Sequence, residues 1–118
     1  MKRDDDLLRK LMLEIEDSPE PMFLFPLTMD SDEDERLQYF HLRLLADEMF
    51  LEETGKFGGN FRMTNKGHDF VAAVRSDTVW GQTKQVAARV SGVSLSLLKD
   101  IAMGIVRDQL TKMGVPLG

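Results

Sequence analysis

The sequence predicts a mainly α-helical domain with a small β-hairpin, an α+β fold, and three observations lead to this class. Apolar residues recur at the helical spacing of three and four in five segments of the chain. A glycine-rich stretch, Gly55–Gly59, separates two short segments that have the composition of strands. With 118 residues, the chain is long enough for one core and too short for two of ordinary size. We therefore expect a single domain over residues 1–118.

The first two predicted elements are a helix and a short strand. The helix spans Asp4–Asp17, because the acids Asp4–Asp6 suit a helix start and apolar residues follow at helical spacing. Ser18–Pro21 ends this helix, since proline neither donates a backbone hydrogen bond nor continues the helix. The apolar run Met22–Phe25 lies just before Pro26 and indicates an edge strand.

A second helix is expected from a cap at Ser31 or Asp32 to about Met49. Its apolar side holds His41, which we interpret as a core histidine with satisfied hydrogen bonds. The opposite side is predicted to face a partner, and it carries Asp32, Glu35, Tyr39, Leu42, Arg43 and Ala46.

The next elements are the hairpin, at Phe50–Met63, and two further helices. Thr64 caps a third helix that runs to about Arg75. A fourth helix restarts at Ser76–Thr78 and runs through Trp80 to Val90. We interpret Trp80 as a core anchor that joins the C-terminal helices to the rest of the domain; the alternative is an anchor at an interface.

The last helix begins after Ser94 or Ser96 and ends at Gly114. It carries more apolar residues than one buried stripe needs. Leu97 and Met103 point away from the centre of the main stripe, so they are the candidate contacts of a homodimer that pairs through this helix. The alternative is that the helix lies between the fourth helix and the rest of the domain.

The order helix, short strand, helix, hairpin, helix is that of a winged-helix domain. Residues 1–76 would form the winged-helix-like part, and residues 77–118 would add two C-terminal helices. The hairpin stands in the place of the wing, and the second helix in the place of the recognition helix. Many winged-helix proteins end that helix at glycine, but this chain has Met49. Because a left-handed methionine costs roughly 1–2 kcal/mol, we expect the helix to end differently or to run on.

Three motifs extend over most of the chain. Residues 1–7 match the opening Met-Lys-Arg-Asp-x-Asp-Leu, and Val93–Leu95 match a Val-Ser-Leu start of the last helix. A Thr-x-x-Gly-His-x-Phe stretch followed by Arg-x-Asp-Thr-x-Trp is matched by Thr64, Gly67, His68, Phe70, Arg75, Asp77, Thr78 and Trp80. In these motifs the sequence resembles a family of small bacterial and prophage proteins known only as a domain of unknown function. The resemblance implies a winged-helix-like fold and a phage or mobile-element setting, with no established activity.

The composition argues against an enzyme, a metal site and a cofactor. The chain has no cysteine and 2 histidines, which excludes disulfides, thiolate zinc sites and cysteine nucleophiles. The acidic run Asp30–Glu35 lacks the glycine and glutamate that an EF-hand loop needs at its positions 6 and 12. His68-Asp69 lacks the further ligands of a metal phosphohydrolase, and we expect His68 to bond to neighbouring backbone or acidic groups. No phosphate loop or nucleophile elbow occurs.

We also expect a cytoplasmic protein that does not span a membrane. No apolar run approaches the roughly 18 residues that a membrane span needs. The basic start, Lys2-Arg3, is followed by acids instead of the apolar stretch of a signal peptide.

The charge pattern weighs two functions against each other. Residues 1–59 have 7 basic against 16 acidic residues, net −9, and residues 60–118 have 8 against 4, net +4. The predicted second helix, residues 32–49, has 6 acids and 2 bases, and phosphates would repel it. We therefore expect a protein-interaction or adaptor module that binds a protein partner or itself. The alternative is a winged-helix DNA-binding regulator that uses Lys56, Arg62 and Lys66 on the wing side.

Overall fold

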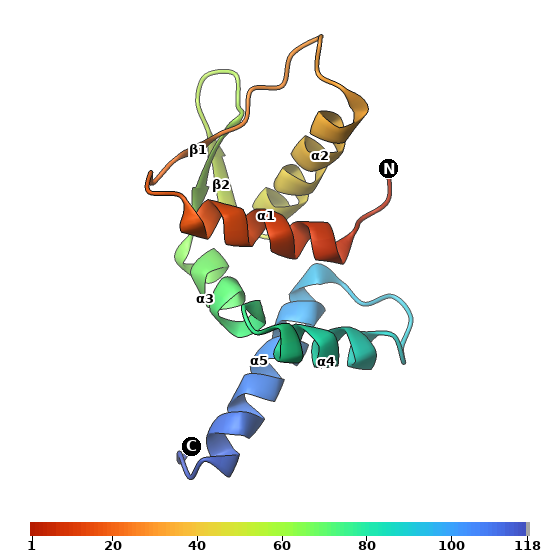
Figure 1. Ribbon diagram of the computed structural model, residues 1–118, viewed down its shortest axis with the longest axis vertical. Helices are drawn as coiled ribbons and strands as arrows, with labels where there is room; N and C mark the ends of the chain where they lie inside the picture. Colours follow the sequence, from red (N-terminus) through yellow and green to blue (C-terminus); the bar gives the residue numbers. More distant parts are fainter. Residues whose placement is uncertain (118) are drawn as a thin grey trace. The chain divides into compact units, whose positions relative to one another are not determined.

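The computed structural model describes residues 1–117 and confirms a mainly helical α+β fold with a small antiparallel sheet (Figure 1). The sheet includes the predicted edge strand, and the fourth helix ends at Ala87 instead of Val90. Among the helices of residues 1–117, none is both long and apolar enough to cross a membrane. The elements in chain order are α1 (Asp5–Asp17), β1 (Phe23–Leu24), α2 (Glu33–Asp47), β2 (Leu51–Thr54), β3 (Asn60–Met63), α3 (Asn65–Val74), α4 (Asp77–Ala87) and α5 (Leu95–Lys112).

The chain forms two compact units, residues 1–71 and residues 72 onward. The division falls inside α3, five residues before the boundary expected from the sequence. The first unit has 9 basic and 17 acidic residues, net −8, and the second has 6 and 3, net +3. The two units therefore differ in the sign of their charge.

The sheet of the first unit has the order β1–β3–β2, with both pairs antiparallel. Phe23 is the partner of Phe61, and Leu51 is the partner of Met63. Helix α2 packs against α1 and also against β2. The core of this unit consists of Leu8, Leu11, Met12, Ile15, Leu42, Leu45, Phe50, Leu51, Phe61, Met63, Phe70 and Val71, all of them buried.

The double packing of α2 corrects one part of the predicted partner-facing side. Leu42 was expected to point outward, but it is buried in the core. The helical wheel assigned one buried side to this helix. In the structure β2 packs against α2 as well as α1, so apolar residues on two sides of the helix are covered.

His41 is a fully buried histidine with a partner at each ring nitrogen, as expected. Its Nδ1 lies 2.8 Å from the carbonyl oxygen of Leu37, which can only accept, so Nδ1 carries the proton. Its Nε2 accepts the backbone N–H of Asp4 at 2.8 Å. Asp4 is in turn the N-cap of α1. His41 therefore fixes the start of α1 against α2.

Helix α2 ends at a left-handed residue, Met49, whose φ is 66°. The Phe50 N–H bonds to the Leu45 carbonyl and the Met49 N–H bonds to the Ala46 carbonyl, each at 3.0 Å. This pair of bonds is a Schellman motif, which usually has glycine in the place of Met49. The expectation that methionine would end this helix differently is therefore wrong. Its two closing hydrogen bonds, and the buried Phe50 that follows, offset the strain.

The stretch Thr64–Phe70 connects β3 to α3 against the end of α2. The Thr64 hydroxyl shares its one hydrogen between the carbonyls of Met49 and Phe50 and accepts the Gly67 N–H. A Cβ added to Gly67 would lie 2.1 Å from the Phe50 carbonyl oxygen, so no side chain fits there. The Phe70 ring stacks on Phe50, with centroids 4.8 Å apart and planes at 4°. These residues therefore have structural roles.

The second unit is built mainly from α4 and α5, which pack on each other. Ser76 caps α4 and Ser94 caps α5 through hydrogen bonds from the N–H groups of Val79 and Leu97. The apolar residues that are buried in this unit are Ala73, Val74, Val79, Trp80, Leu95, Leu98 and Ala102. The prediction that Trp80 is buried is confirmed, since it is 6% exposed.

Two glycines of this unit lie at exposed positions within helices, Gly81 in α4 and Gly104 in α5. A glycine inside a helix costs about 1 kcal/mol relative to alanine. A Cβ added at either position would meet no atom within 4 Å. Packing among the described residues therefore gives no reason for glycine at either place.

Candidate functional site

The predicted partner-facing helix and the predicted wing are joined by one polar cluster. The Tyr39 hydroxyl on α2 donates to Glu53 Oε2 on β2 at 2.7 Å. The same oxygen accepts the Gly59 N–H at 2.9 Å, which fixes the turn between β2 and β3. Arg43 lies 3.7 Å from Glu53 Oε1 and stands over the Tyr39 ring, 5.9 Å from its centroid. Tyr39 and Arg43 therefore hold the turn against α2.

The environment of Glu53 shifts two pKa values. Burial alone would raise the pKa of the Glu53 carboxyl, but the Gly59 N–H, the Tyr39 hydroxyl and the Arg43 charge outweigh burial. They hold this pKa below its ordinary value of 4.5. The pKa of Tyr39 is raised above its ordinary value of 10.0, first because its hydroxyl donates to Glu53 and second because it is partly buried. Glu53 therefore stays ionised, and Tyr39 protonated, at neutral pH.

Replacing Glu53 by glutamine is expected to lower the free energy of unfolding at neutral pH by about 1–2 kcal/mol, because two donors lose a charged acceptor. Since the pKa of Glu53 is depressed in the folded state, its carboxylate stabilises the fold above its ordinary pKa of 4.5. This contribution disappears as the pH falls through the lowered value. Urea unfolding in a series of buffers of decreasing pH, starting from pH 4.5, should therefore show the free energies of unfolding of wild type and Glu53→Gln converging.

The neighbouring Glu52 offers a matched control. Its exposed carboxylate pairs with Arg62 at 3.3 Å, and such surface pairs contribute little. The Glu52→Gln protein should stay within about 0.5 kcal/mol of wild type. A deficit of Glu53→Gln that remains constant through the acidic range would contradict the assigned role of the carboxylate.

The other predicted residues of α2 remain accessible but also have structural roles. Asp32 and Glu35 form a capping box, in which the Glu35 N–H donates to Asp32 Oδ1 at 2.8 Å. Both side chains are exposed, and Ala46 is half-buried. With Leu42 buried, the outward side of α2 keeps five of its six predicted residues and is more polar than expected.

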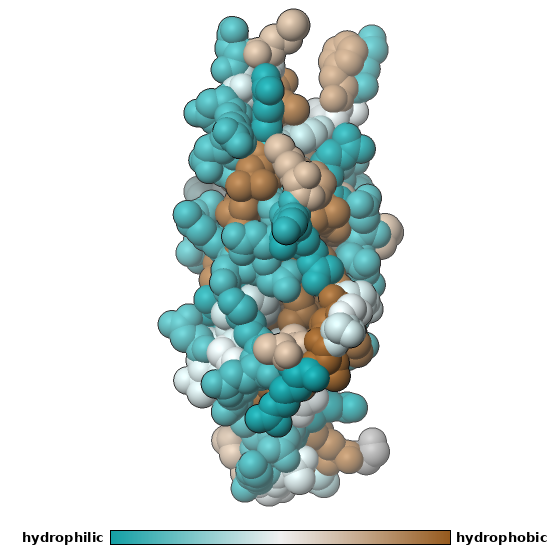
Figure 2. Space-filling view, turned by 90° about the vertical axis from the view of Figure 1, so that its right-hand side faces the viewer, coloured by the Kyte–Doolittle hydropathy of each residue, from teal (hydrophilic) through white to brown (hydrophobic). Residues whose placement is uncertain are grey.

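A surface that the sequence analysis missed lies at the end of the first unit. Met29 and Phe57 are 96% and 91% exposed, and Leu24 and Leu27 are also exposed. We call these four residues the tip surface. Beside them lies a pocket of about 360 Å³, whose lining includes Pro26, Leu27, Tyr39, Phe57, Gly58 and Gly59. Figure 2 shows apolar side chains at its upper end, where Figure 1 places the β2–β3 turn and the β1–α2 loop.

Two exposed residues of the tip surface could have been suspected from their neighbours. Phe57 lies inside the glycine-rich turn, and Met29 lies between Thr28 and the acidic run that begins at Asp30. A large apolar residue among turn-forming and charged residues does not belong to the periodic apolar pattern by which a helix or a strand faces the core. This signal distinguishes both residues from the periodic apolar positions of the core.

The three residues predicted to contact nucleic acid, Lys56, Arg62 and Lys66, do not form a strip of cations without other contacts. Arg62 pairs with Glu52 and donates to the Met63 carbonyl at 3.4 Å. Lys66 is half-buried, with its Nζ 5.4 Å from the centroid of the Phe50 ring. Lys56 is exposed beside Phe57. Each of the three cations therefore has a contact within the chain: Arg62 with Glu52, and the two lysines with phenylalanine rings.

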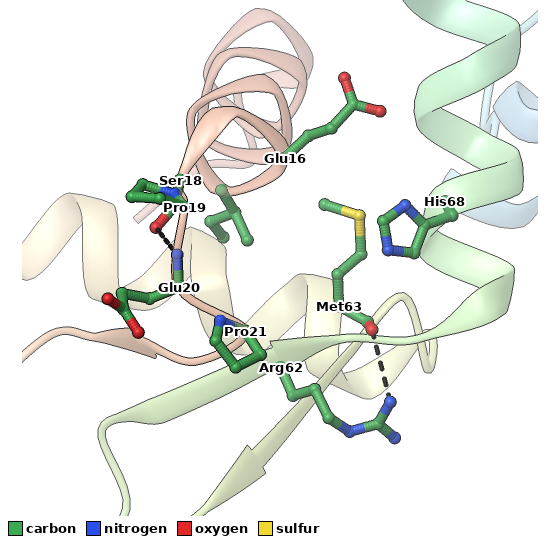
Figure 3. A pocket seen from close by; sticks show the side chains of 9 residues that line it. Glu16, Ser18, Pro19, Glu20, Pro21, Arg62, Met63 and His68 are labelled. Carbon is green, nitrogen blue, oxygen red and sulfur yellow. Dashed lines mark hydrogen bonds between the residues drawn. The ribbon is translucent and has the colours of Figure 1, made fainter.

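A second pocket, of about 430 Å³, lies between the end of α1, β3 and α3 (Figure 3). In the view shown, Met63 and His68 lie on one side and the loop residues Ser18–Pro21 on the other. His68 is exposed, and its imidazole has no hydrogen-bond partner among residues 1–117, contrary to expectation. Its backbone N–H bonds to the Thr64 carbonyl at 3.0 Å within the first turn of α3.

The β3 backbone at this pocket lacks a complete strand partner. The Gly59 carbonyl accepts the Phe25 N–H, so residues 59, 61 and 63 direct their backbone groups toward β1. Strand β1 begins only at Phe23, opposite Phe61, so no strand residue pairs with Met63 on this side, and Pro21 beside it has no N–H to donate. The Met63 carbonyl accepts from the Arg62 guanidinium instead. The pocket is therefore an edge feature of the sheet.

The predicted dimer contacts Leu97 and Met103 are both exposed. They are six residues apart, which at 100° per residue puts them about 120° from each other around α5. A pocket of about 540 Å³ lies on the side of Leu97, and its lining includes Ile101, Gly104, Ile105 and Asp108 of α5. Leu97 and Met103 therefore do not belong to one contact stripe.

Comparison with known proteins supports the coarser part of the resemblance noted in the sequence, a family of unknown function. Residues 2–94 match the model of the family described as Hypothetical protein (DUF2513). A relative from Haemophilus influenzae, described as an uncharacterized protein, is 28% identical over 118 residues, which cover 93% of this chain and 99% of the relative. No solved structure matches the chain. Because the family match extends from α1 to the cap of α5, the chain belongs to the DUF2513 family.

Proposed function

We propose that the chain is a non-enzymatic interaction module that binds a protein partner through the tip surface. The observation that carries this proposal is the exposure of four large apolar side chains on two neighbouring loops and β1. Scattered single apolar residues are normal on protein surfaces, but a group beside a pocket is typical of interaction sites. Phe57 and Met29 have the side chains that interfaces favour.

The charges near the tip surface define the chemistry of the partner. Residues 30–35 contain five acids, and all five are exposed. They lie in the loop that follows Met29 and in the first turn of α2. A complementary partner would present a basic segment with an aromatic or aliphatic anchor for the pocket beside Phe57. Lys56 at the turn and Arg43 beside Tyr39 are cations that would oppose such a partner.

The proposed architecture, biological setting, compartment and alternative function each rest on a separate observation. A winged-helix-like architecture is supported by the element order and by the strand order β1–β3–β2. A phage or mobile-element setting is supported by the sequence resemblance alone. Action in the cytoplasm, without a metal or cofactor, is supported by the lack of cysteine and by the two separate histidines. The second function, DNA binding, is supported by Lys56 on the exposed turn.

A peptide selection tests the proposal. Random 12-residue peptides displayed on phage would be selected on the full chain, and the enriched peptides measured by fluorescence polarisation. We expect peptides that combine lysine or arginine with an aromatic or aliphatic residue. Phe57→Ser should weaken them by about tenfold or more, because interface anchors contribute most of the affinity. Val90→Ser removes another exposed apolar side chain, outside the tip surface, and should leave binding unchanged.

Two results would overturn the proposal. One is a selection without enrichment, or with peptides that bind Phe57→Ser as well as wild type. The other is submicromolar binding to generic duplex DNA that weakens steeply with salt and disappears in Lys56→Glu. The latter result would favour the DNA-binding function.

A further inference from the structure

Helix α5 has a second apolar stripe in addition to the buried one. Leu95, Leu98 and Ala102 are buried, whereas Ile101 and Ile105 are half-buried and Leu97 is exposed. Leu97, Ile101, Gly104, Ile105 and Asp108 recur at spacings of four, three, one and three, so they share one side of the helix. Together with Val86 of α4 and Arg89 in the turn that follows α4, most of this side lines the groove of about 540 Å³, which we call the α4–α5 groove.

Gly104 removes a side chain from the middle of this groove. Helix α5 runs from Leu95 to Lys112, so Gly104 lies at its midpoint. No described atom occupies the space where its Cβ would be, although glycine is unfavourable inside a helix. A missing side chain at this place lets another backbone approach closely. Gly81 is equally open but does not line the groove.

The charges of the groove complement each other. Arg89, in the turn that follows α4, and Asp108 on α5 both line it, and no other charged side chain does so among the described residues. Asp108 also pairs with Lys112 at 2.9 Å, but both side chains are exposed and such a surface pair contributes little. Two copies of such a patch, related by a two-fold axis, can place each arginine near the partner's carboxylate. The basic segment proposed for the tip surface would gain less here, because the second unit is net positive.

We propose that the α4–α5 groove takes helix α5 of a second copy of this chain, as an antiparallel two-fold pair centred on Gly104. Leu97, Ile101 and Ile105 of each copy supply the apolar contact, and Gly104 sets the close approach. The chain is then a homodimer joined through its second unit. This inference is independent of the function proposed for the tip surface.

Light scattering coupled to size exclusion, at protein concentrations from 5 to about 200 μM, tests the inference over the range where protein dimers of ordinary affinity form. The full chain should give about twice 13.4 kDa at the upper concentrations. Gly104→Gln should give 13.4 kDa, because the glutamine side chain fills the approach site. Gly81→Gln should remain dimeric.

Both glutamine variants improve helix propensity, so each should melt at or above the wild-type temperature where wild type is monomeric. This measurement separates lost pairing from lost folding. A charge exchange provides a second readout: Asp108→Arg should weaken the dimer by about tenfold. Asp108→Arg combined with Arg89→Asp should restore the dimer.

A mass of 13.4 kDa for wild type at every concentration overturns the inference. A dimer that persists in a folded Gly104→Gln protein overturns it as well, because the contact then lies elsewhere, for example at Met103. An Asp108→Arg defect that the second exchange does not restore excludes the two-fold pairing of Arg89 with Asp108.

Discussion

Replacing Gly67 by alanine is expected to lower the free energy of unfolding by about 3 kcal/mol or more. The added Cβ would lie 2.1 Å from the Phe50 carbonyl oxygen, a backbone atom that cannot swing aside. To make room, the start of α3 must move away from the end of α2. That movement would disturb the hydrogen bonds of Thr64 and the stacking of Phe70 on Phe50.

Chemical unfolding monitored by circular dichroism measures this effect, and Gly81→Ala is the matched control. Both changes add one methyl group to a helical glycine. At Gly81 the methyl group meets nothing within 4 Å, so alanine should stabilise the chain by about 1 kcal/mol. A Gly67→Ala protein as stable as wild type would show that α3 can shift without cost. The close contact between Gly67 and the Phe50 carbonyl would then not fix the position of α3.

The helices could be predicted from the sequence because their signals are local. Asp32, Ser76 and Ser94 cap helices in the structure as their residue types indicate. The apolar positions of α1 recur at the spacing that buries Leu8, Leu11, Met12 and Ile15 together. Each of these signals lies within one or two turns of the residue that it places.

Two features of α2 could not be predicted, because they depend on distant segments. The burial of Leu42 requires β2 to pack beside the helix, and a helical wheel contains no information about a second neighbour. The left-handed Met49 is set by bonds to Ala46 and Leu45 and by the buried Phe50. The preference for glycine at left-handed positions alone predicted that α2 would end differently.

The candidate sites were predicted in part, for a similar reason. The outward exposure of Asp32, Glu35 and Arg43 follows from helical periodicity. The contact between Tyr39 and Glu53 joins residues 14 positions apart and depends on the fold. The tip surface combines Leu27 with Phe57, which line one pocket because the pairing of β1 with β3 brings the β1–α2 loop beside the β2–β3 turn.

The two proposed surfaces lie in different units, and this has a consequence for experiments. The tip surface belongs to residues 1–71, and the α4–α5 groove belongs to the later residues. Substitutions that share no partner act additively. Phe57→Ser should therefore reduce peptide binding without changing the mass of the chain in solution. Gly104→Gln should change the mass and leave the affinity of a single tip surface unaltered.

Replacing Trp80 by alanine is expected to lower the free energy of unfolding by about 3–5 kcal/mol, the usual cost of emptying a buried aromatic site. Trp80 is 6% exposed and is the largest of the seven buried apolar residues from position 72 onward, since the other six are two alanines, two valines and two leucines. A unit of this size buries few other large side chains, so its structure has little stability to lose.

The single tryptophan makes the measurement direct. Its emission should be that of a buried indole in the folded wild type and should shift toward longer wavelength on unfolding. Trp80→Phe keeps an aromatic ring in the site and should cost about half as much as Trp80→Ala, since the cavity left behind is smaller. At about 4–8 °C for each kcal/mol, the alanine variant should melt more than 10 °C below wild type. An unchanged melting temperature would instead mean that Trp80 packs at a surface, where its loss leaves no cavity.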